Sequence, residues 1–143
     1  MKLLVALMAL GMLTGCLSRM VQPREDAIAL ALAGKSQISG DALDRKVAAA
    51  ARHSLGSRGN PVRAEMPESE RAYLARLRCS DGKGPTLERM GSFGDGPYGN
   101  ILDGYAVNCG EAAPGKVQVF MDMYHSGHVE TRAVPGFTIM PAG

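Results

Sequence analysis

The sequence predicts an α+β fold, in which two N-terminal helices pack on a small and mainly antiparallel sheet. Apolar residues recur at helical spacing up to Gly56, and they alternate with polar residues in short runs after Glu70. Helices that gather early in a chain and strands that gather late are typical of α+β domains, in which the helices cover one face of the sheet.

The first helix is expected from Pro23 to about Gly34. Proline suits the first helical position, and Glu25 and Asp26 complement the helix dipole in the first turn. The following apolar side chains are mostly alanine and leucine, and Gly34 is a typical helix stop. We expect the alanine-rich face of this helix to pack inside the protein.

The second helix is expected from about Gly40 to Leu55 and ends at Gly56. Its apolar residues recur at helical spacing: Leu43, Val47, Ala50, Ala51 and Leu55. Gly59-Asn60-Pro61 then predicts a turn, after which the chain extends again.

The stretch from Tyr73 to Cys79 fits a helix or a strand. We favour a strand, because alternation places four residues on one face: Tyr73, Ala75, Leu77 and Cys79. The glycines and proline of Asp81–Pro85 predict a turn, and a further strand is expected around Thr86–Met90.

The remaining strands are expected after residue 104. Tyr105–Cys109 is one, and Lys116–Tyr124 is the clearest in the chain. Bulky residues on both faces of Lys116–Tyr124 predict that it lies inside the sheet. His128–Val134 and Phe137–Met140 can supply one or two closing strands.

The segment Gly91–Gly104 is rich in Gly, Pro, Asp and aromatic residues. A phosphate-binding loop leads from a strand into a helix and carries a Gly-Lys-Ser/Thr motif, and this segment does neither. We expect a structured loop with two exposed aromatic residues, and such loops commonly carry binding function. Four residues are the predicted contacts for a partner: Phe93, Asp95, Tyr98 and Asn100.

One group of residues has the side chains of a metal site: Asp122, His125, His128 and Glu130. Imidazole and carboxylate groups suit zinc or copper(II), so a metal site here is the sharper interpretation. The two histidines lie across a predicted turn and share no helix face. We therefore favour ordinary turn histidines and expect no metal or other cofactor.

Catalytic and nucleic-acid-binding functions have little support in the sequence. No serine lies in a Gly-x-Ser-x-Gly elbow, and we expect no enzymatic activity. Lys and Arg number 16 and Asp and Glu number 14, with the two signs interspersed along the chain. This balance offers no electrostatic surface for nucleic acid.

The N-terminus has the form of a secretory signal. Met1 and Lys2 precede the apolar run Leu3–Leu13, which at about 11 residues is well short of the roughly 20 that span a bilayer. The run ends in Leu13-Thr14-Gly15-Cys16, which resembles the lipobox of bacterial lipoproteins. The alternative is an ordinary secretory signal that is cut at another small residue.

The resemblance implies that Cys16 is lipidated on its thiol and becomes the new N-terminus. Residues 1–15 are then a signal peptide, 16–22 a tether, and 23–143 one globular domain. Leu17 stands where an Asp would retain such a protein in the inner membrane. Leu17 therefore favours the periplasmic face of the outer membrane.

Cysteine usage agrees with export. When Cys16 carries lipid, Cys79 and Cys109 remain as an even pair, and we expect them to form a disulfide in an oxidising compartment. Two free thiols are the alternative.

Taken as a whole, the chain resembles the small, uncharacterised lipoproteins of Gram-negative bacteria. The resemblance implies a lipid-anchored cell-envelope protein with a structural or interaction role. Its partners would be the membrane, through the lipid, and an envelope protein. The alternative function is a periplasmic metal-binding lipoprotein that uses the region of His125 and His128.

Overall fold

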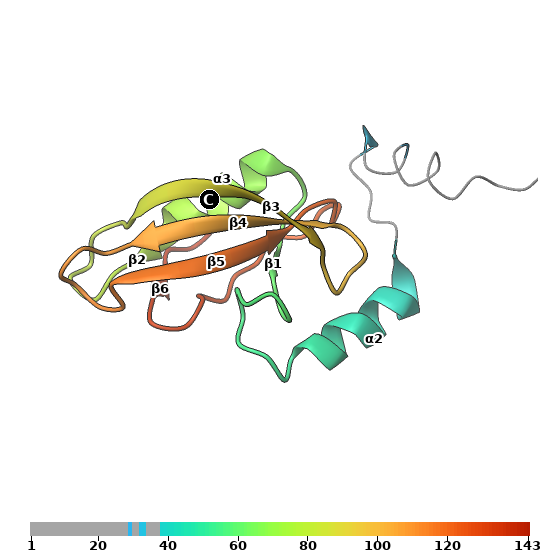
Figure 1. Cartoon of the computed structure of the whole chain (residues 1–143), viewed down its shortest axis with the longest axis horizontal. Coiled ribbons are helices and arrows are strands. Elements are labelled where there is room, and N and C mark those ends of the chain that lie inside the picture. The colour runs from blue at the N-terminus through green and yellow to red at the C-terminus, as the bar shows by residue number, and fades with distance from the viewer. Residues whose placement is uncertain (1–28, 30–31, 34–37) are drawn as a thin grey trace, which may run out of the picture.

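The computed structural model describes residues 29, 32–33 and 38–143. The predicted signal peptide and tether lie outside these residues. The described part contains two short helices, a four-stranded sheet and a two-stranded sheet (Figure 1). The elements are α2 (Gly40–Ala50), β1 (Val62–Arg63), α3 (Pro67–Arg76), β2 (Leu77–Arg78), β3 (Thr86–Asp95), β4 (Ile101–Asn108), β5 (Lys116–Asp122) and β6 (Thr138–Ile139).

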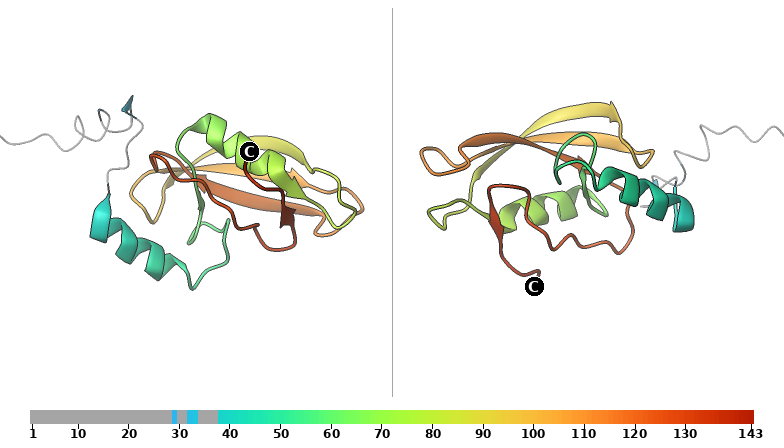
Figure 2. Two further views of the ribbon diagram at one scale, coloured as in Figure 1. Left: turned by 180° about the vertical axis from the view of Figure 1, so that it is seen from behind. Right: turned by 90° about the horizontal axis from the view of Figure 1, so that it is seen from below.

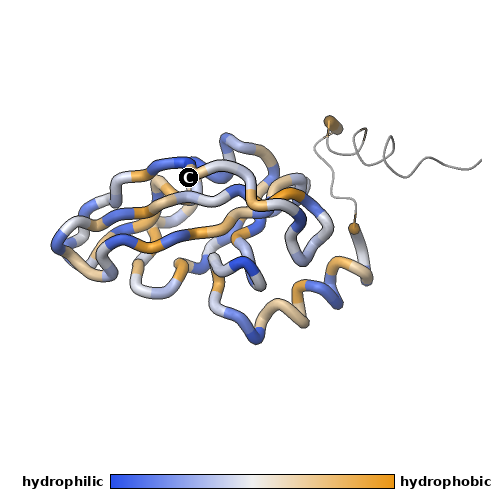
Figure 3. Tube along the Cα trace, viewed as in Figure 1, coloured by the Kyte–Doolittle hydropathy of each residue, from blue (hydrophilic) through white to orange (hydrophobic). Residues whose placement is uncertain are grey.

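The predicted fold, with two N-terminal helices on an antiparallel sheet, is wrong. The helix predicted from Pro23 to Gly34 lies outside the described residues, except for three of its positions. The predicted second helix exists as α2, but Ala50 is its only buried residue. Figure 3 shows hydrophobic and hydrophilic segments alternating along α2, and its small alanine side chains bury little area. The core is therefore rich in sheet, and the four-stranded sheet is mixed.

The predicted strand from Tyr73 to Cys79 is also wrong, because most of it is the helix α3. Pro67 occupies the first turn, where its missing N–H costs nothing, and Glu68 and Glu70 complement the helix dipole there. The buried residues of α3 are Glu70, Tyr73 and Leu74, a spacing of three and four that defines one helix face. The alternation that suggested a strand is incidental to this spacing.

The main sheet has the strand order β1-β5-β4-β3. β5 lies between β1, which runs parallel to it, and β4, which runs antiparallel, as its two bulky faces predicted. Figure 2 shows α3 and the C-terminal segment on one face of this sheet. The core between them contains Val62, Ala64, Tyr73, Leu74, Leu77, Cys79, Tyr105, Val107, Val119, Met121, Val134 and Phe137.

Of the one or two closing strands that were expected after β5, the structure contains one, which lies within Phe137–Met140. Residues 128–134 form a loop, and the short strand β6 pairs with β2 outside the main sheet. No helix among the described residues is long and apolar enough to cross a membrane.

Candidate functional site

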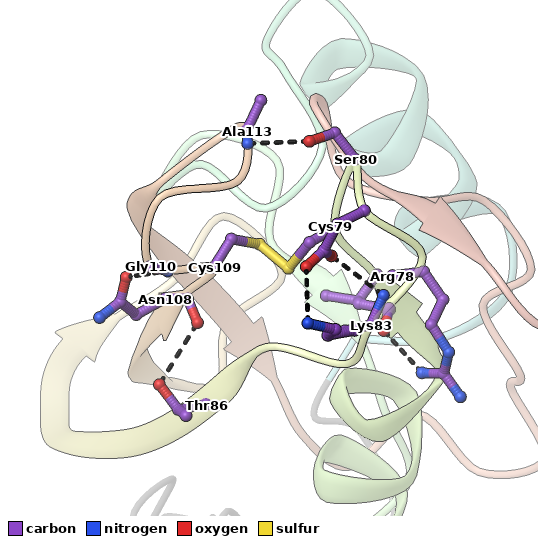
Figure 4. The surroundings of a disulfide bond; sticks show 11 residues. Arg78, Cys79, Ser80, Lys83, Thr86, Asn108, Cys109, Gly110 and Ala113 are labelled. Carbon is purple, nitrogen blue, oxygen red and sulfur yellow. Dashed lines mark hydrogen bonds and ion pairs between the residues drawn. A yellow bond between two sulfur atoms is a disulfide. The ribbon is translucent and has the colours of Figure 1, made fainter.

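The predicted disulfide is present between Cys79 and Cys109 (Figure 4). Cys79 follows β2 and Cys109 follows β4, and their Cα atoms are 5.8 Å apart. Ser80 and Ala113 extend this connection, because the Ala113 backbone N–H donates to Ser80 Oγ at 2.9 Å. The bond therefore joins the two-stranded sheet to one end of the main sheet.

The residues of the predicted binding loop are largely internal, so the expectation of two exposed aromatic residues is wrong. Tyr98 is 1% exposed and Asn100 is 2% exposed. Phe93 is half-buried in β3, lies against Gly104, and makes an edge-on contact with Phe120, with 5.2 Å between ring centroids. Of the four, Asp95 alone is well exposed.

Tyr98 and Asn100 instead support a buried polar cluster at the end of β5. His125 Nε2 lies 2.7 Å from Asp122 Oδ1, and Asn100 Nδ2 donates to the same oxygen at 2.8 Å. The Tyr98 ring contacts the His125 imidazole edge-on at 5.5 Å, and its hydroxyl donates to Asn60 Oδ1 at 3.2 Å. Burial raises the pKa of Tyr98, which keeps its hydroxyl protonated as a donor.

The backbone between Asp122 and His125 explains how the two side chains meet. Tyr124 has a φ of 69°, a left-handed conformation that is uncommon for residues other than glycine. The chain then turns at His125–His128, where the backbone N–H of His128 donates to His125 O at 3.0 Å. Its position is further fixed because the backbone N–H of His125 donates to Ala64 O at 3.0 Å.

The chemistry of the His125–Asp122 pair is limited by its burial. Asp122 is 0% exposed and His125 is 3% exposed. Among the described residues, neither side chain makes a hydrogen bond to a hydroxyl or thiol that could act as a nucleophile. Asp122 Oδ2 and His125 Nδ1 have no hydrogen-bond partner in this part of the chain. The pair therefore acts as a buried cross-link between β5 and the turn that follows it.

The four metal candidates do not form one cluster. His128 Nε2 lies 3.8 Å from Glu130 Oε2, and this second pair is separate from the first. Glu130 is bound instead by Arg132, through hydrogen bonds of 2.9 Å to each of its oxygens. Within the described residues, no three His, Cys, Asp or Glu side chains gather where they could hold one ion.

The electrostatics of Glu130 follow from these contacts. Burial alone would raise its pKa, but His128, Arg132 and the backbone N–H of Arg132 outweigh burial and hold the pKa well below the usual range. Glu130 is therefore a carboxylate whose charge is already matched. It is poorly suited to bind a metal ion, since its lone pairs are occupied.

A second buried acid, Glu70, was not predicted from the sequence. It is 0% exposed on α3, and Tyr105 Oη of β4 donates to its Oε2 at 2.8 Å. Burial raises the pKa of Glu70 to about 7, although the hydrogen bond from Tyr105 opposes this shift. The helical spacing of Glu70, Tyr73 and Leu74 was the signal that could have revealed its position.

No protein-family model, curated protein or solved structure matches the chain.

Proposed function

We propose that the protein is a lipid-anchored cell-envelope protein at the periplasmic face of the outer membrane, with an interaction role for its folded domain. The observation that carries the proposal is how the cysteines are used. The chain has three cysteines, and Cys79 and Cys109 are joined to each other. The remaining cysteine, Cys16, ends the lipobox-like Leu13-Thr14-Gly15-Cys16. Disulfides persist in compartments such as the periplasm, which supports export.

An interaction role is supported by the edge strand β3. In the described part of the chain β3 pairs with β4 alone, and its residues are exposed or half-buried along its whole length. Leu87 is 40% exposed and Met90 is 52% exposed. An edge strand offers unpaired backbone groups to which a partner strand can bind. An envelope protein with an extended segment is therefore the kind of partner that this domain suits.

The lipid anchor is tested by labelling cells with radioactive palmitate. The wild-type protein should incorporate label, and Cys16→Ser should incorporate none and remain uncleaved. The matched control is the Cys79→Ser, Cys109→Ser double variant, which keeps Cys16 and should still be labelled. Label that persists in Cys16→Ser, or its absence from wild type, contradicts the proposal.

The membrane assignment has a separate test. Wild-type protein should sediment with outer-membrane markers in a sucrose gradient, whereas Leu17→Asp should sediment with inner-membrane markers. Leu17→Asn is the matched control for size and should behave more like wild type than the Asp variant does. Wild-type protein in the inner-membrane fraction would show that the outer-membrane assignment is wrong while leaving lipidation intact.

A further inference from the structure

The stretch of chain between Asp44 and Glu65 is basic and contains no acidic residue. It covers most of α2, the turn that follows, and β1. Its charged residues are Arg45, Lys46, Arg52, Arg58 and Arg63. Since the charge of the whole chain is nearly balanced, this stretch is a local excess of positive charge.

Two of these basic residues line one cleft at the C-terminal end of α2. The cleft has a volume of about 310 Å³, and no acidic residue of the described chain lines it. Within the same part of the chain Lys46 makes no hydrogen bond or ion pair, and Arg52 makes one side-chain contact, to His53 Nε2 at 3.2 Å. The residues that line the cleft are Lys46, Ala49, Ala50, Arg52, His53, Gly59 and Pro97.

The two acids of α2 lie at the other end of the helix. Asp41 is in the first turn and stands four positions before Arg45, so these two opposite charges share one helix face. Asp44 and Lys46 are two positions apart, and side chains at this spacing do not face each other on a helix. Neither acid therefore offsets the charges at the cleft.

The loop on the other side of the cleft carries one charge of each sign close together. Asp95 is exposed and lies two positions before Pro97, which lines the cleft. Arg58 binds the same strand, because its guanidinium donates to Phe93 O at 2.8 Å. With Arg58 counted against Asp95, the positive charge of the cleft itself remains.

The position of α2 suits contact with the membrane that would hold Cys16. Gly40 is 24 positions after Cys16 (40 − 16), and a chain of that length spans at most roughly 80–90 Å. α2 lies at one end of the domain (Figure 1), and Ala50 is its only buried residue. Because the anchor keeps the domain within this distance of lipid, a weak attraction is enough to hold α2 at the surface.

We propose that Lys46, Arg52 and His53 form a basic surface that binds the anionic headgroups of the membrane carrying the anchor. The proposal rests on the proposed lipidation of Cys16. Anionic lipid attracts basic residues that lie within a Debye length, about 8 Å at physiological ionic strength. Exposed side chains suit this role, since they reach the headgroups directly. The basic surface would determine which end of the domain faces the membrane.

Lysine acetylation by an uncharged N-hydroxysuccinimide ester tests the proposal on protein extracted from membranes and reconstituted into lipid nanodiscs. Discs of phosphatidylcholine are compared with discs that also contain phosphatidylglycerol. Lys46 should react at least about threefold more slowly in the anionic discs, and salt at about 1 M should remove the difference. Lys83 is the matched control and should react equally in both discs, because its side chain is 83% exposed in a turn outside the basic surface.

The location is tested with Arg52→Gln, which removes a single side-chain contact, the one to His53. The variant should keep the wild-type melting temperature, and its Lys46 should react faster in anionic discs than Lys46 of wild type. Arg71→Gln is the matched control on α3, where the Arg71 side chain is 60% exposed, and it should behave as wild type. Equal reactivity of wild-type Lys46 in the two discs, or protection that Arg52→Gln leaves intact, would overturn the proposal.

Elution of the protein with the discs separates this proposal from lipidation. A lipidated protein elutes with both kinds of disc, and unprotected Lys46 in such a protein overturns the basic surface alone. Elution with the anionic discs alone would contradict lipidation and support the basic surface. Elution with neither kind of disc would overturn both proposals.

Discussion

Glu70 of α3 accepts a hydrogen bond from the Tyr105 hydroxyl of β4 at 2.8 Å, inside the interface between helix and sheet. Glu70 Oε1 is buried with no hydrogen-bond partner among the described residues. The one hydrogen bond from Tyr105 therefore replaces only part of the hydration that the carboxyl group loses on burial. This incomplete replacement favours the protonated, neutral form of Glu70. The fixed position of Tyr105 on β4 makes this acid a contact that orients α3 on the sheet.

The raised pKa of Glu70 makes a prediction about stability. The folded-state pKa is about 7, above its ordinary value of 4.5. Between these two pH values the folded state binds more protons than the unfolded state. The contribution of Glu70 to the free energy of unfolding therefore falls as pH rises through this window. Glu70→Gln should remove this loss of stability. The loss is up to about 3 kcal/mol, because each unit of difference between the folded and unfolded pKa corresponds to 1.36 kcal/mol.

Urea denaturation at pH 5 and at pH 8 measures the effect. Glu70→Gln should gain stability relative to wild type at pH 8 and differ less from it at pH 5. Glu68→Gln is the control, because Glu68 lies on the same helix with its side chain 76% exposed. Parallel pH profiles for wild type and Glu70→Gln would show that Glu70 is not the group that titrates.

The disulfide predicts a loss of stability when it is removed. Cys79 and Cys109 are separated by 30 positions, and closing a loop of this length stabilises by roughly 3–4 kcal/mol in the chain-entropy model. Cys79→Ser should lower the unfolding free energy by a few kcal/mol in chemical denaturation. Iodoacetamide should modify neither cysteine of exported protein without reductant, and alkylation of both would mean that the bond is absent in cells.

The separation of the two histidine pairs predicts the response to metals. Because His125 is bound to Asp122 and Glu130 to Arg132, zinc or copper should leave the melting temperature unchanged. A specific site would instead add about 2.7 kcal/mol at a hundredfold excess of metal over its dissociation constant. A melting temperature that rises with zinc in wild type, but not in His125→Ala, His128→Ala, would restore the metal-binding alternative.

The local pattern of the sequence located β5 and the second half of β4, where apolar and polar residues alternate in short runs. It missed the first half of β4 and the end of β3, because the glycine-rich segment Gly91–Gly104 was expected to be a loop. It failed at Tyr73–Cys79, where an alternating pattern coincided with a helix that begins at Pro67. The parallel pairing of Val62 with Met121 could not be predicted, since it joins positions far apart in the chain and β1 is only two residues long.

In the candidate sites, too, local features could be predicted from the sequence and features that depend on tertiary packing could not. The disulfide followed from counting cysteines, and the pair Asp122 and His125 is local, three residues apart. A surface cleft lined by residues that include Arg63, Ser69 and His128 forms only through the packing of β1, α3 and the loop after β5. The sequence carries no spacing that relates these three residues, and the burial of Tyr98 and Asn100 likewise depends on contacts with His125, Asp122 and Asn60.

The central claim is that Cys16 is the lipidated N-terminus of the mature protein, and the intact mass of the wild-type protein extracted from membranes tests it most directly. We predict the mass of residues 16–143 increased by a diacylglyceryl group, with or without a third acyl chain on the amine. The Cys79–Cys109 bond should lower this mass by two hydrogens until reductant is added. A mature protein that begins at another residue and carries no acyl mass would contradict the claim.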